Sequence, residues 1–242
     1  MIRAIERALL ILDSFDTAHP RQTLQEIASR TNLSKATAFR LVGTLVKGGY
    51  LLRDEAQKYR LSLEVLRLSS FAEVDINIQA VLRPLMAQVG KQAGETVALY
   101  TSSGSSRVCI ETVQIPSPLM RIVIVGEQVP LIRGAIGRTL LAQMTDSENE
   151  MILAESALPK NDPMVLRKRI EIVRHRGYDV ARSERVVGAT AIAVPIHHRL
   201  KSGAHYCLAI VGPSARIDDR LEELTLMLRK AGQKASRELG AD

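Results

Sequence analysis

The sequence lacks the features of disulfide-stabilised and membrane-spanning proteins. Its two cysteines, Cys109 and Cys207, are far apart, and neither has a second cysteine nearby. A disulfide framework and a cysteine metal site are therefore excluded, and we interpret both side chains as buried thiols. No apolar run approaches the roughly 18 residues that a helix needs to span a bilayer, so no membrane segment is predicted.

The beginning of the chain also lacks the core of a signal peptide. The first residues, MIRAIERALLILDSF, carry apolar side chains at helical spacing, but Glu6 and Asp13 interrupt the run. We expect a folded helix over residues 3–15 and a cytoplasmic protein.

The motifs of common enzyme classes are missing as well. The chain has no Walker-type phosphate loop, no dinucleotide glycine fingerprint and no nucleophile elbow, so neither catalysis nor a cofactor is predicted. His197, His198 and His205 have no carboxylate or cysteine at ligand spacing. We interpret them as residues of a hairpin turn and predict no metal site.

What the chain does have is an ample supply of apolar residues and an excess of positive charge. Hydrophobic residues make up 46% and charged residues 24% of its 242 residues, as in one large or two small globular domains. The net charge is +7, and residues 1–61 hold ten Lys and Arg against six Asp and Glu. This concentration favours a partner with phosphate groups in the first quarter of the chain.

The stretch over residues 23–50 predicts two short helices joined by a tight turn. Thr23 precedes Glu26 by three residues, which is the spacing of a capping box. Ser34 can cap the second helix, and the glycine pair beginning at Gly48 can end it.

The second helix would have two contrasting faces. Each residue of a helix advances by about 100°, so four apolar side chains fall together and can face a core. The opposite face carries small, hydroxyl and basic side chains, which suit a DNA major groove. An ordinary solvated helix would show the same amphipathic pattern. The core-facing residues are Ala38, Leu41, Val42 and Leu45, and the outward residues are Ala36, Thr37, Arg40, Thr44 and Lys47.

A β-hairpin is predicted next, in the sequence YLLRDEAQKYRL. Its second arm alternates Lys58 and Arg60 with apolar residues, as in the wing that follows many helix-turn-helix motifs and contacts DNA phosphates. A helix over 62–72 follows. We place a domain boundary near residue 75, where no flexible linker occurs.

From residue 78 the pattern changes to a mixture of helices and strands. This order predicts an α+β domain with a largely antiparallel sheet. The expected strands are 95–101, 107–113, 119–125, 178–182, 191–196 and 206–211. The expected helices are 78 to Gly90 or Gly94, 135–144, 147–155, a basic helix from the cap Asp162 to Arg176, and 218–239.

Sequence motifs along the whole chain follow the order and spacing of one known family. They are ERALLILDSF, LQEIASRTNLSKATAFRLVGTLVKGGYL and YRL in the first part, and VGEQVPLIRGAIGRTLLA, RHRGYDVARSE, GATAIAVPI and AIVGP in the second. On these motifs the chain resembles the isocitrate-lyase-regulator (IclR) family of bacterial transcription factors. The resemblance implies a winged helix-turn-helix over 1–61, a linker helix over 62–76 and an effector-binding and oligomerisation domain over 77–242. The last would hold a curved, mainly antiparallel six-stranded sheet with flanking helices, similar to GAF and profilin domains.

The resemblance further implies a repressor or activator of a catabolic operon. Such proteins bind palindromic or pseudo-palindromic double-stranded DNA as homodimers, and dimers can pair into tetramers. Arg40 falls on the arginine usual at its place in the family, and we expect it to contact DNA directly. The residues expected at the DNA are Ser34, Lys35, Ala36, Thr37, Phe39, Arg40, Thr44 and Lys47 on the recognition helix, with Lys58 and Arg60 on the wing.

The resemblance also implies that the second domain binds a small organic carboxylate. Gly134 and Ala135 open a predicted helix whose free N–H groups would favour an anion. Gly134 could equally serve only to ease a tight turn. Arg133 could pair with the carboxylate or lie on the surface.

In the expected pocket the sequence departs from the family members that bind small acids. Polar positions of those members are matched here by small apolar side chains, which would leave a hydroxylated two-carbon acid unpaired. We therefore predict an aromatic or alkyl carboxylate and a role in aromatic catabolism. At the pocket edge Glu184 could form an ion-pair cluster with Arg182 and Arg185. The matched small residues are Ala181, Ala191, Ala209 and Val211.

Two other functions fit the same sequence. The second domain could serve only for oligomerisation, or it could be an enzyme fused to a DNA-binding domain. Against the enzyme, the serines between residues 102 and 106 lie in a predicted loop without a nearby histidine. A metabolite that raises the melting temperature would favour a sensor over a domain that only oligomerises.

Overall fold

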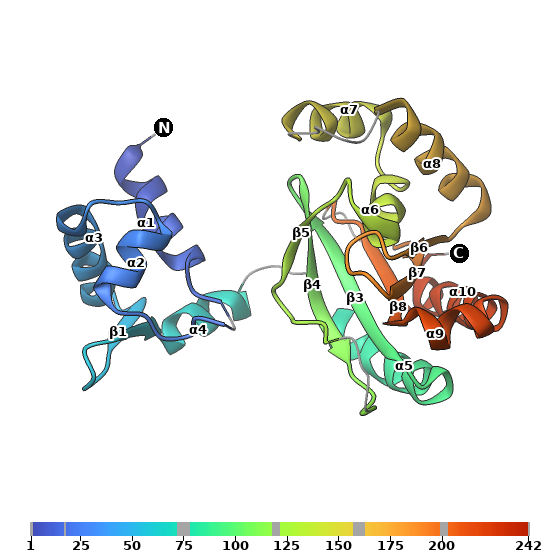
Figure 1. The fold of residues 1–242 in the computed structure, drawn as a ribbon, viewed down its shortest axis with the longest axis horizontal. Helices are drawn as coiled ribbons and strands as arrows, with labels where there is room; N and C mark the ends of the chain where they lie inside the picture. Colours follow the sequence, from blue (N-terminus) through green and yellow to red (C-terminus); the bar gives the residue numbers. More distant parts are fainter. Residues whose placement is uncertain are drawn as a thin grey trace. The chain divides into compact units, whose positions relative to one another are not determined.

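The computed structural model describes residues 2–16, 18–71, 78–117, 122–156, 163–198 and 203–241. The chain divides into two compact units, Met1–Val74 and Asp75–Asp242 (Figure 1). Separate groups of buried apolar residues form the cores of the two units. None of the described helices is long and apolar enough to cross a membrane.

The first unit contains a helix-turn-helix followed by a β-hairpin. Its elements are α1 (Arg3–Asp13), α2 (Leu24–Arg30), α3 (Lys35–Lys47), β1 (Leu51–Arg53), β2 (Tyr59–Leu61) and α4 (Leu63–Phe71). The capping box predicted at the start of α2 is present, because Thr23 and Glu26 each accept a hydrogen bond from the other's backbone N–H. The predicted cap of α3 is also confirmed: Ser34 Oγ accepts from the backbone N–H of Thr37.

One small core holds this unit together. Ile11 and Ile27, from the first two helices, are fully buried in it, as is Leu51 from the hairpin. Val42 and Leu45 bury the inner face of α3 in the same core. Helix α3 is therefore held by its apolar face, and its other face is exposed.

The second unit is built on a six-stranded antiparallel sheet. Its strands are β3 (Thr96–Ser103), β4 (Ser106–Val113), β5 (Gln128–Pro130), β6 (Asp179–Arg182), β7 (Ala189–Ile196) and β8 (Tyr206–Pro213). They follow the order β5–β4–β3–β8–β7–β6, and every neighbouring pair is antiparallel. The predicted α+β fold class is confirmed.

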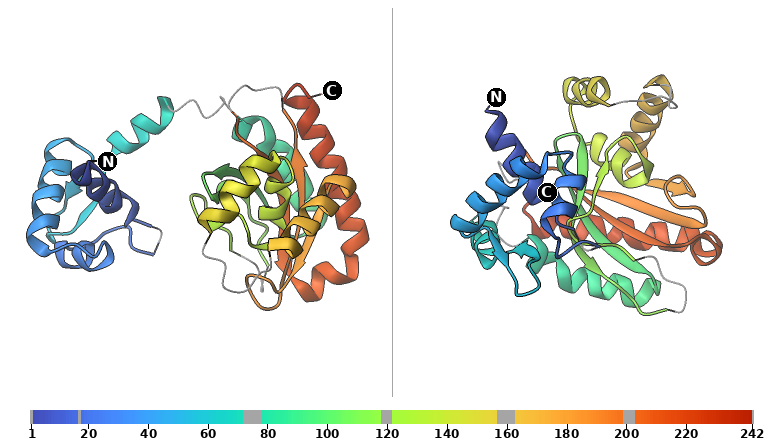
Figure 2. Two further views of the ribbon diagram at one scale, coloured as in Figure 1. Left: turned by 90° about the horizontal axis from the view of Figure 1, so that it is seen from above. Right: turned by 60° about the vertical axis from the view of Figure 1, so that its left-hand side comes forward.

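One face of this sheet is covered by α5 (Ile78–Ala93) and α10 (Leu221–Glu238), as Figures 1 and 2 show. The strands direct large side chains to this side, among them Ile192, Leu208 and Ile210. Burial of such side chains contributes about 25 cal/mol per Å² of apolar surface, so this layer supplies much of the unit's stability.

The opposite face of the sheet lies beneath α6 (Gly134–Leu141), as the ribbon views show (Figure 2). This face carries much smaller side chains. Ala98, Ala209 and Ala193 pair across three adjacent strands and are fully buried there. The short side chains let α6 lie close to the strands and leave room beside its first turn.

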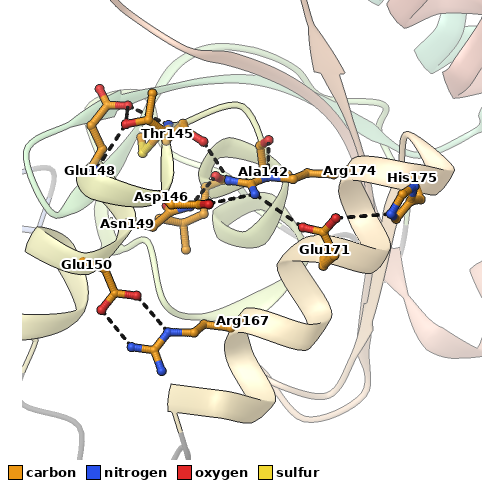
Figure 3. Close-up of polar contacts among 12 residues, drawn as sticks. Ala142, Thr145, Asp146, Glu148, Asn149, Glu150, Arg167, Glu171, Arg174 and His175 are labelled. Atoms are coloured by element: carbon orange, nitrogen blue, oxygen red, sulfur yellow. Dashed lines mark hydrogen bonds and ion pairs between the residues drawn. The ribbon is translucent and has the colours of Figure 1, made fainter.

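Two further helices, α7 (Asp146–Glu155) and α8 (Pro163–Arg176), fix the far end of α6 (Figure 3). Arg174 donates from Nε to the carbonyl of Ala142 at 3.2 Å and from Nη2 to the carbonyl of Met144 at 2.8 Å. These carbonyls lie at the C-terminal end of α6, where a cation satisfies unpaired acceptors and is favoured by the helix dipole.

Figure 3 also shows how α7 is itself anchored. Arg167 of α8 donates two hydrogen bonds of 2.8 Å to the carboxylate of Glu150. Thr145 and Glu148 form a second capping box at the start of α7. The position of α6 is thus set from both ends, by the sheet and by these two helices.

The third strand differs from its prediction. Residues 119–121 of the expected strand lie outside the described residues, and 122–125 are not in a strand. The strand is instead β5, which pairs with residues 106–108 of β4. The apolar run was mistaken for a strand because it sends Val123 into the core beneath α6 from an irregular segment.

The cap predicted at Asp162 lies outside the described residues. The predicted start of the last helix was approximate. The last helix is preceded by a short helix, α9 (Ser214–Ile217), and a 3-10 turn, η1 (Asp218–Arg220), so that α10 begins later than expected.

Candidate functional site

The outward face of α3 is basic and has no acidic residue. Lys35, Arg40 and Lys47 are exposed on it, and the helix, KATAFRLVGTLVK, contains no Asp or Glu. Phe39 lies on the same face with 61% of its surface exposed. The smaller predicted contact residues Ala36 and Thr44 are exposed and Thr37 is half-buried. This face therefore presents cations, a hydroxyl group and an apolar ring to a partner.

The N-terminal end of α3 is shaped by Ser34. Its hydroxyl oxygen lies 2.9 Å from that of Thr37 and 3.3 Å from the backbone nitrogen of the same residue. The other N–H groups of the first turn have no acceptor within the helix. Such a helix N-terminus favours a phosphate group.

The hairpin directs two basic side chains away from the core. Tyr59, the first residue of β2, lies between Lys58 and Arg60 and is buried, whereas Lys58 is exposed and Arg60 half-buried. Neither these two residues nor the basic residues of α3 form an ion pair with any described residue. Their charges are therefore available to an external anion.

Replacing Lys58 by glutamine is expected to weaken the binding of all DNA duplexes alike. A lysine that only neutralises a phosphate releases a counterion, so the slope of log affinity against log salt should fall by about one per Lys58 in the complex. Fluorescence anisotropy at several salt concentrations measures this slope. Lys91→Gln, which removes an exposed lysine of the second unit, should leave it unchanged. An altered sequence preference in Lys58→Gln would contradict a phosphate contact.

A cavity of about 50 Å³ lies between the small-residue face of the sheet and the start of α6. The structure brings six of the eight predicted ligand-binding residues together around it. These residues are Gly134, Ala135, Ala181, Glu184, Ala191 and Val211.

The other two predicted residues do not line this cavity. Arg133 is exposed, and its carbonyl oxygen, not its side chain, turns inward to accept a hydrogen bond from Arg107. Gly134 follows with a φ of +74°, a conformation that glycine adopts without strain and that the tight turn into α6 requires. Ala209 is buried beneath α6, in the row of alanines. The side chain of Arg133, which could have paired with a ligand, is thus not part of the cavity wall.

Glu184 has other partners than the sequence suggested. It accepts hydrogen bonds from Arg138 of α6 at 2.6 Å and from Arg169 of α8 at 3.0 Å. Burial acts to raise the pKa of Glu184, but the contacts with these arginines outweigh it and the pKa is lowered overall. Arg138 also pairs with the buried Asp179 at 2.5 Å. The arginines expected beside Glu184 are engaged elsewhere, Arg182 with Asp218 and Arg185 with Glu127.

Several polar residues of the cavity wall were missed, among them Tyr100 and Arg107. The guanidinium carbon of Arg107 lies 5.9 Å from the centre of the Tyr100 ring. An arginine at the start of a strand is normally taken as a surface residue. It lies on the same side of β4 as Cys109, a residue type that is usually buried, and this spacing could have revealed it. The cavity is consequently less apolar than predicted.

The two cysteines are buried, as predicted. Burial raises the pKa of the Cys109 thiol to about 12, and it raises that of Cys207 further. Both therefore remain protonated and chemically inert near neutral pH.

The histidines near residue 200 have structural partners. His198 Nε2 lies 2.6 Å from the carbonyl oxygen of Ala204, and its ring packs edge-on against Tyr206. Within the part of the chain that the structure describes, no group of three or more His, Cys, Asp and Glu could hold a metal ion.

Both units match known domains. Residues 4–55 match the IclR helix-turn-helix domain, and residues 71–237 match the domain described as bacterial transcriptional regulator IclR C-terminal. The HTH-type transcriptional regulator KipR of Bacillus subtilis (strain 168) is 26% identical, over 98% of this chain and 97% of its own. The regulator XynR of Escherichia coli (strain K12) is 27% identical, over 99% and 98% of the two chains.

Solved structures have the same fold. An IclR family transcriptional regulator from Brucella abortus has a TM-score of 0.77 at 28% identity, covering 98% of this chain and 92% of that one. An IclR homolog from Microbacterium hydrocarbonoxydans, complexed with 4-hydroxybenzoate, has a TM-score of 0.83 at 24% identity and covers 98% of each chain.

The helix-turn-helix unit and the α+β unit together define a DNA-binding transcriptional regulator rather than an enzyme. Matches to both domains extend over most of the sequence, in the order found in the relatives. The chain belongs to the IclR family of bacterial transcriptional regulators.

Proposed function

We propose that the protein regulates transcription of a catabolic operon in response to a small organic carboxylate bound in the cavity beside α6. One observation carries the proposal: a single chain combines a basic, acid-free helix face with a cavity at a helix N-terminus. The first feature suits DNA and the second suits an anionic ligand.

DNA binding as a homodimer is part of the proposal. One recognition helix contacts only a few base pairs, so specificity needs two copies on a palindromic or pseudo-palindromic site. The exposed apolar side chains of α1, Ile5, Leu9 and Leu10, support an assembly of this kind. Apolar patches on a surface commonly mark contacts with a partner. Pairing of dimers into tetramers and the winged-helix and linker boundaries at residues 61 and 76 belong to the same proposal.

For the effector we propose an aromatic or alkyl carboxylate. Ala181, Ala191 and Val211 form an apolar wall of the cavity, where the hydroxyl groups of a more polar acid would remain unpaired. The complex of the Microbacterium homolog with 4-hydroxybenzoate supports an acid of this class in a protein of the same fold.

A panel of carboxylates tests the proposal. DNA sites are first selected from random duplexes, and each acid is then assayed for its effect on the melting temperature and on DNA affinity. At least one aromatic or alkyl acid should raise the melting temperature, because a ligand that binds only the native state stabilises it. The same acid should change the affinity for the selected duplex. If no acid does either, the second unit serves only for oligomerisation. Preferential binding of glyoxylate would contradict the apolar class.

A further inference from the structure

Two arginines among the described residues of the second unit are almost fully buried, and they differ in their partners. Arg138 is 3% exposed and Arg107 is 2% exposed. The guanidinium of Arg138 is held by Asp179 at 2.5 Å and by Glu184 at 2.6 Å. Arg107 forms no ion pair with any described residue. Removing a cation from water without a counter-charge is strongly unfavourable, so the environment of Arg107 needs an explanation.

The guanidinium of Arg107 lies against the first turn of α6. Its Nη1 donates to the carbonyl of Arg133, and its Nε–H has no hydrogen-bond partner among the described residues. Gly137 allows this approach, because a methyl group added there would lie only 3.1 Å from Nη1. A methyl group at Gly134 would lie at ordinary contact distance, 4.0 Å, from both terminal nitrogens. Arg107 therefore reaches the cavity with part of its donor capacity unused.

The surroundings of Arg107 add positive charge instead of balancing it. The N-terminal end of α6 carries a partial positive charge from the helix dipole. Glu184 lines the same cavity but is held by Arg138, and Glu127, whose charge also acts on Arg107, is held by Arg185. The guanidinium of Arg107 and the N-terminal end of α6 thus meet at one place, and the two acidic residues near them in the described part of the chain are already paired.

The pKa shifts of the two buried arginines have opposite signs. Burial lowers the pKa of Arg107, and nothing around it outweighs this effect. Burial acts on Arg138 in the same way, but its hydrogen bonds and charge interactions with Glu184 and Asp179 raise its pKa overall. An anion beside Arg107 would offset the effect of burial on its charge, as Glu184 and Asp179 do for Arg138.

We propose that Arg107 is the counter-cation for the carboxylate of a monocarboxylic effector, which contacts both its guanidinium and the N–H groups at the start of α6. The inference rests on the proposed function of the cavity and adds the residue that sets the charge and orientation of the ligand. A guanidinium donates two parallel hydrogen bonds to a carboxylate, and a helix N-terminus donates more. The uncharged body of the acid lies along the apolar wall of Ala135, Ala181, Ala191 and Val211.

Binding of benzoate and isobutyrate to the full chain, each compared with its neutral amide, tests the inference. At constant ionic strength both acids should raise the melting temperature, and benzamide and isobutyramide should not. In Arg107→Met the dissociation constants of the acids, measured by titration calorimetry, should rise about 10- to 100-fold, as for lost charge-assisted hydrogen bonds. Arg107→Lys keeps the charge but not the forked geometry and should bind with intermediate affinity. Arg133→Met, at the exposed neighbour, is the matched control and should bind as the wild type does.

A second measurement needs no ligand. Without ligand, Arg107→Met removes an uncompensated cation and should melt at or above the wild-type temperature. Arg138→Met removes one of the two arginines that pair with the buried Asp179, together with a partner of Glu184, and should melt clearly lower. If the melting temperature of Arg107→Met fell as far as that of Arg138→Met, Arg107 would be a structural residue and the inference would be overturned.

The failure of this inference can be told from the failure of the proposed function. Acids that bind the wild type and Arg107→Met equally well would overturn the inference and leave the proposed function standing. Acids that bind through Arg107 without changing DNA affinity would overturn the proposed function and leave the inference standing. Equal stabilisation by acids and amides, or stabilisation by neither acid, would also overturn the inference.

Discussion

Replacing Gly137 by alanine is expected to destabilise the second unit by about 3 kcal/mol or more, a large part of the stability of a typical domain. The added methyl group would lie 1.8 Å from the carbonyl oxygen of Leu131 and 2.7 Å from its carbonyl carbon. These are backbone atoms of the turn before α6, and they cannot rotate aside as the end of a side chain can. Helix α6 would have to lift from the sheet, and the cavity wall would be lost with it.

Differential scanning calorimetry of the full chain measures this effect, and Gly43 offers a matched control. Gly43 is also a helical glycine, but a methyl group added there would have nothing within 4 Å. Gly43→Ala should therefore stabilise the first unit, by up to about 1 kcal/mol, because alanine is the better helix former. If Gly137→Ala melted at the wild-type temperature, α6 would be free to shift, and the close packing described above would not be a constraint.

Replacing Arg40 by alanine is expected to remove most sequence-specific DNA binding. The Arg40 side chain is exposed near the middle of α3 and has no ion-pair partner among the described residues, so its position has no structural role. An arginine that contacts a base pair through two hydrogen bonds contributes about 1–3 kcal/mol of discrimination. The proposed homodimer holds two copies, so the loss would be about 2–6 kcal/mol, at least about 30-fold in affinity.

Anisotropy titrations with a selected duplex and a scrambled duplex measure this loss. Binding of the selected duplex to Arg40→Ala should fall to the level of the scrambled one, and the melting temperature should not change. Arg237→Ala, at an exposed arginine of α10, controls for the loss of one positive charge. An Arg40→Ala protein that still distinguished the two duplexes would show that Arg40 contacts only the DNA backbone.

Elements with strong local signals could be predicted from the sequence. Thr23 and Ser34 mark the starts of α2 and α3 because a capping side chain must stand at one defined place relative to the first turn. Strands β7 and β8 were found because they are apolar runs of strand length bounded by turn residues. Each of these signals lies within a few residues of the element that it defines.

Strand β4 was predicted, but its register and its neighbour β5 could not be predicted by the same rules. Leu99 pairs with Glu111 and Tyr100 pairs with Cys109, so Ile110 is an extra residue that forms a bulge. A bulge reverses the alternation of inward and outward side chains, which a strict period of two does not anticipate. The adjacent strand β5 has only three residues and leaves no pattern of its own.

The cavity was predicted only in part for a related physical reason. Its small residues, such as Ala181 and Ala191, follow from matching a known family position by position. Arg107 belongs to the cavity because Gly137, distant from it in sequence, lets α6 lie against its guanidinium. Such a contact is a property of the tertiary structure, and no local pattern contains it.

The unequal faces of the sheet assign different roles to alternate residues of the same strand. In β7 and β8 the even-numbered Ile192 and Leu208 fill the layer under α5 and α10, and the odd-numbered Ala191, Ala209 and Val211 face α6. Substitutions at Ala191 and Val211, which line the cavity, would change its shape while the other layer keeps the unit folded. Ligand preference and thermal stability can therefore evolve separately within one strand, and new effector specificities are accessible without rebuilding the fold.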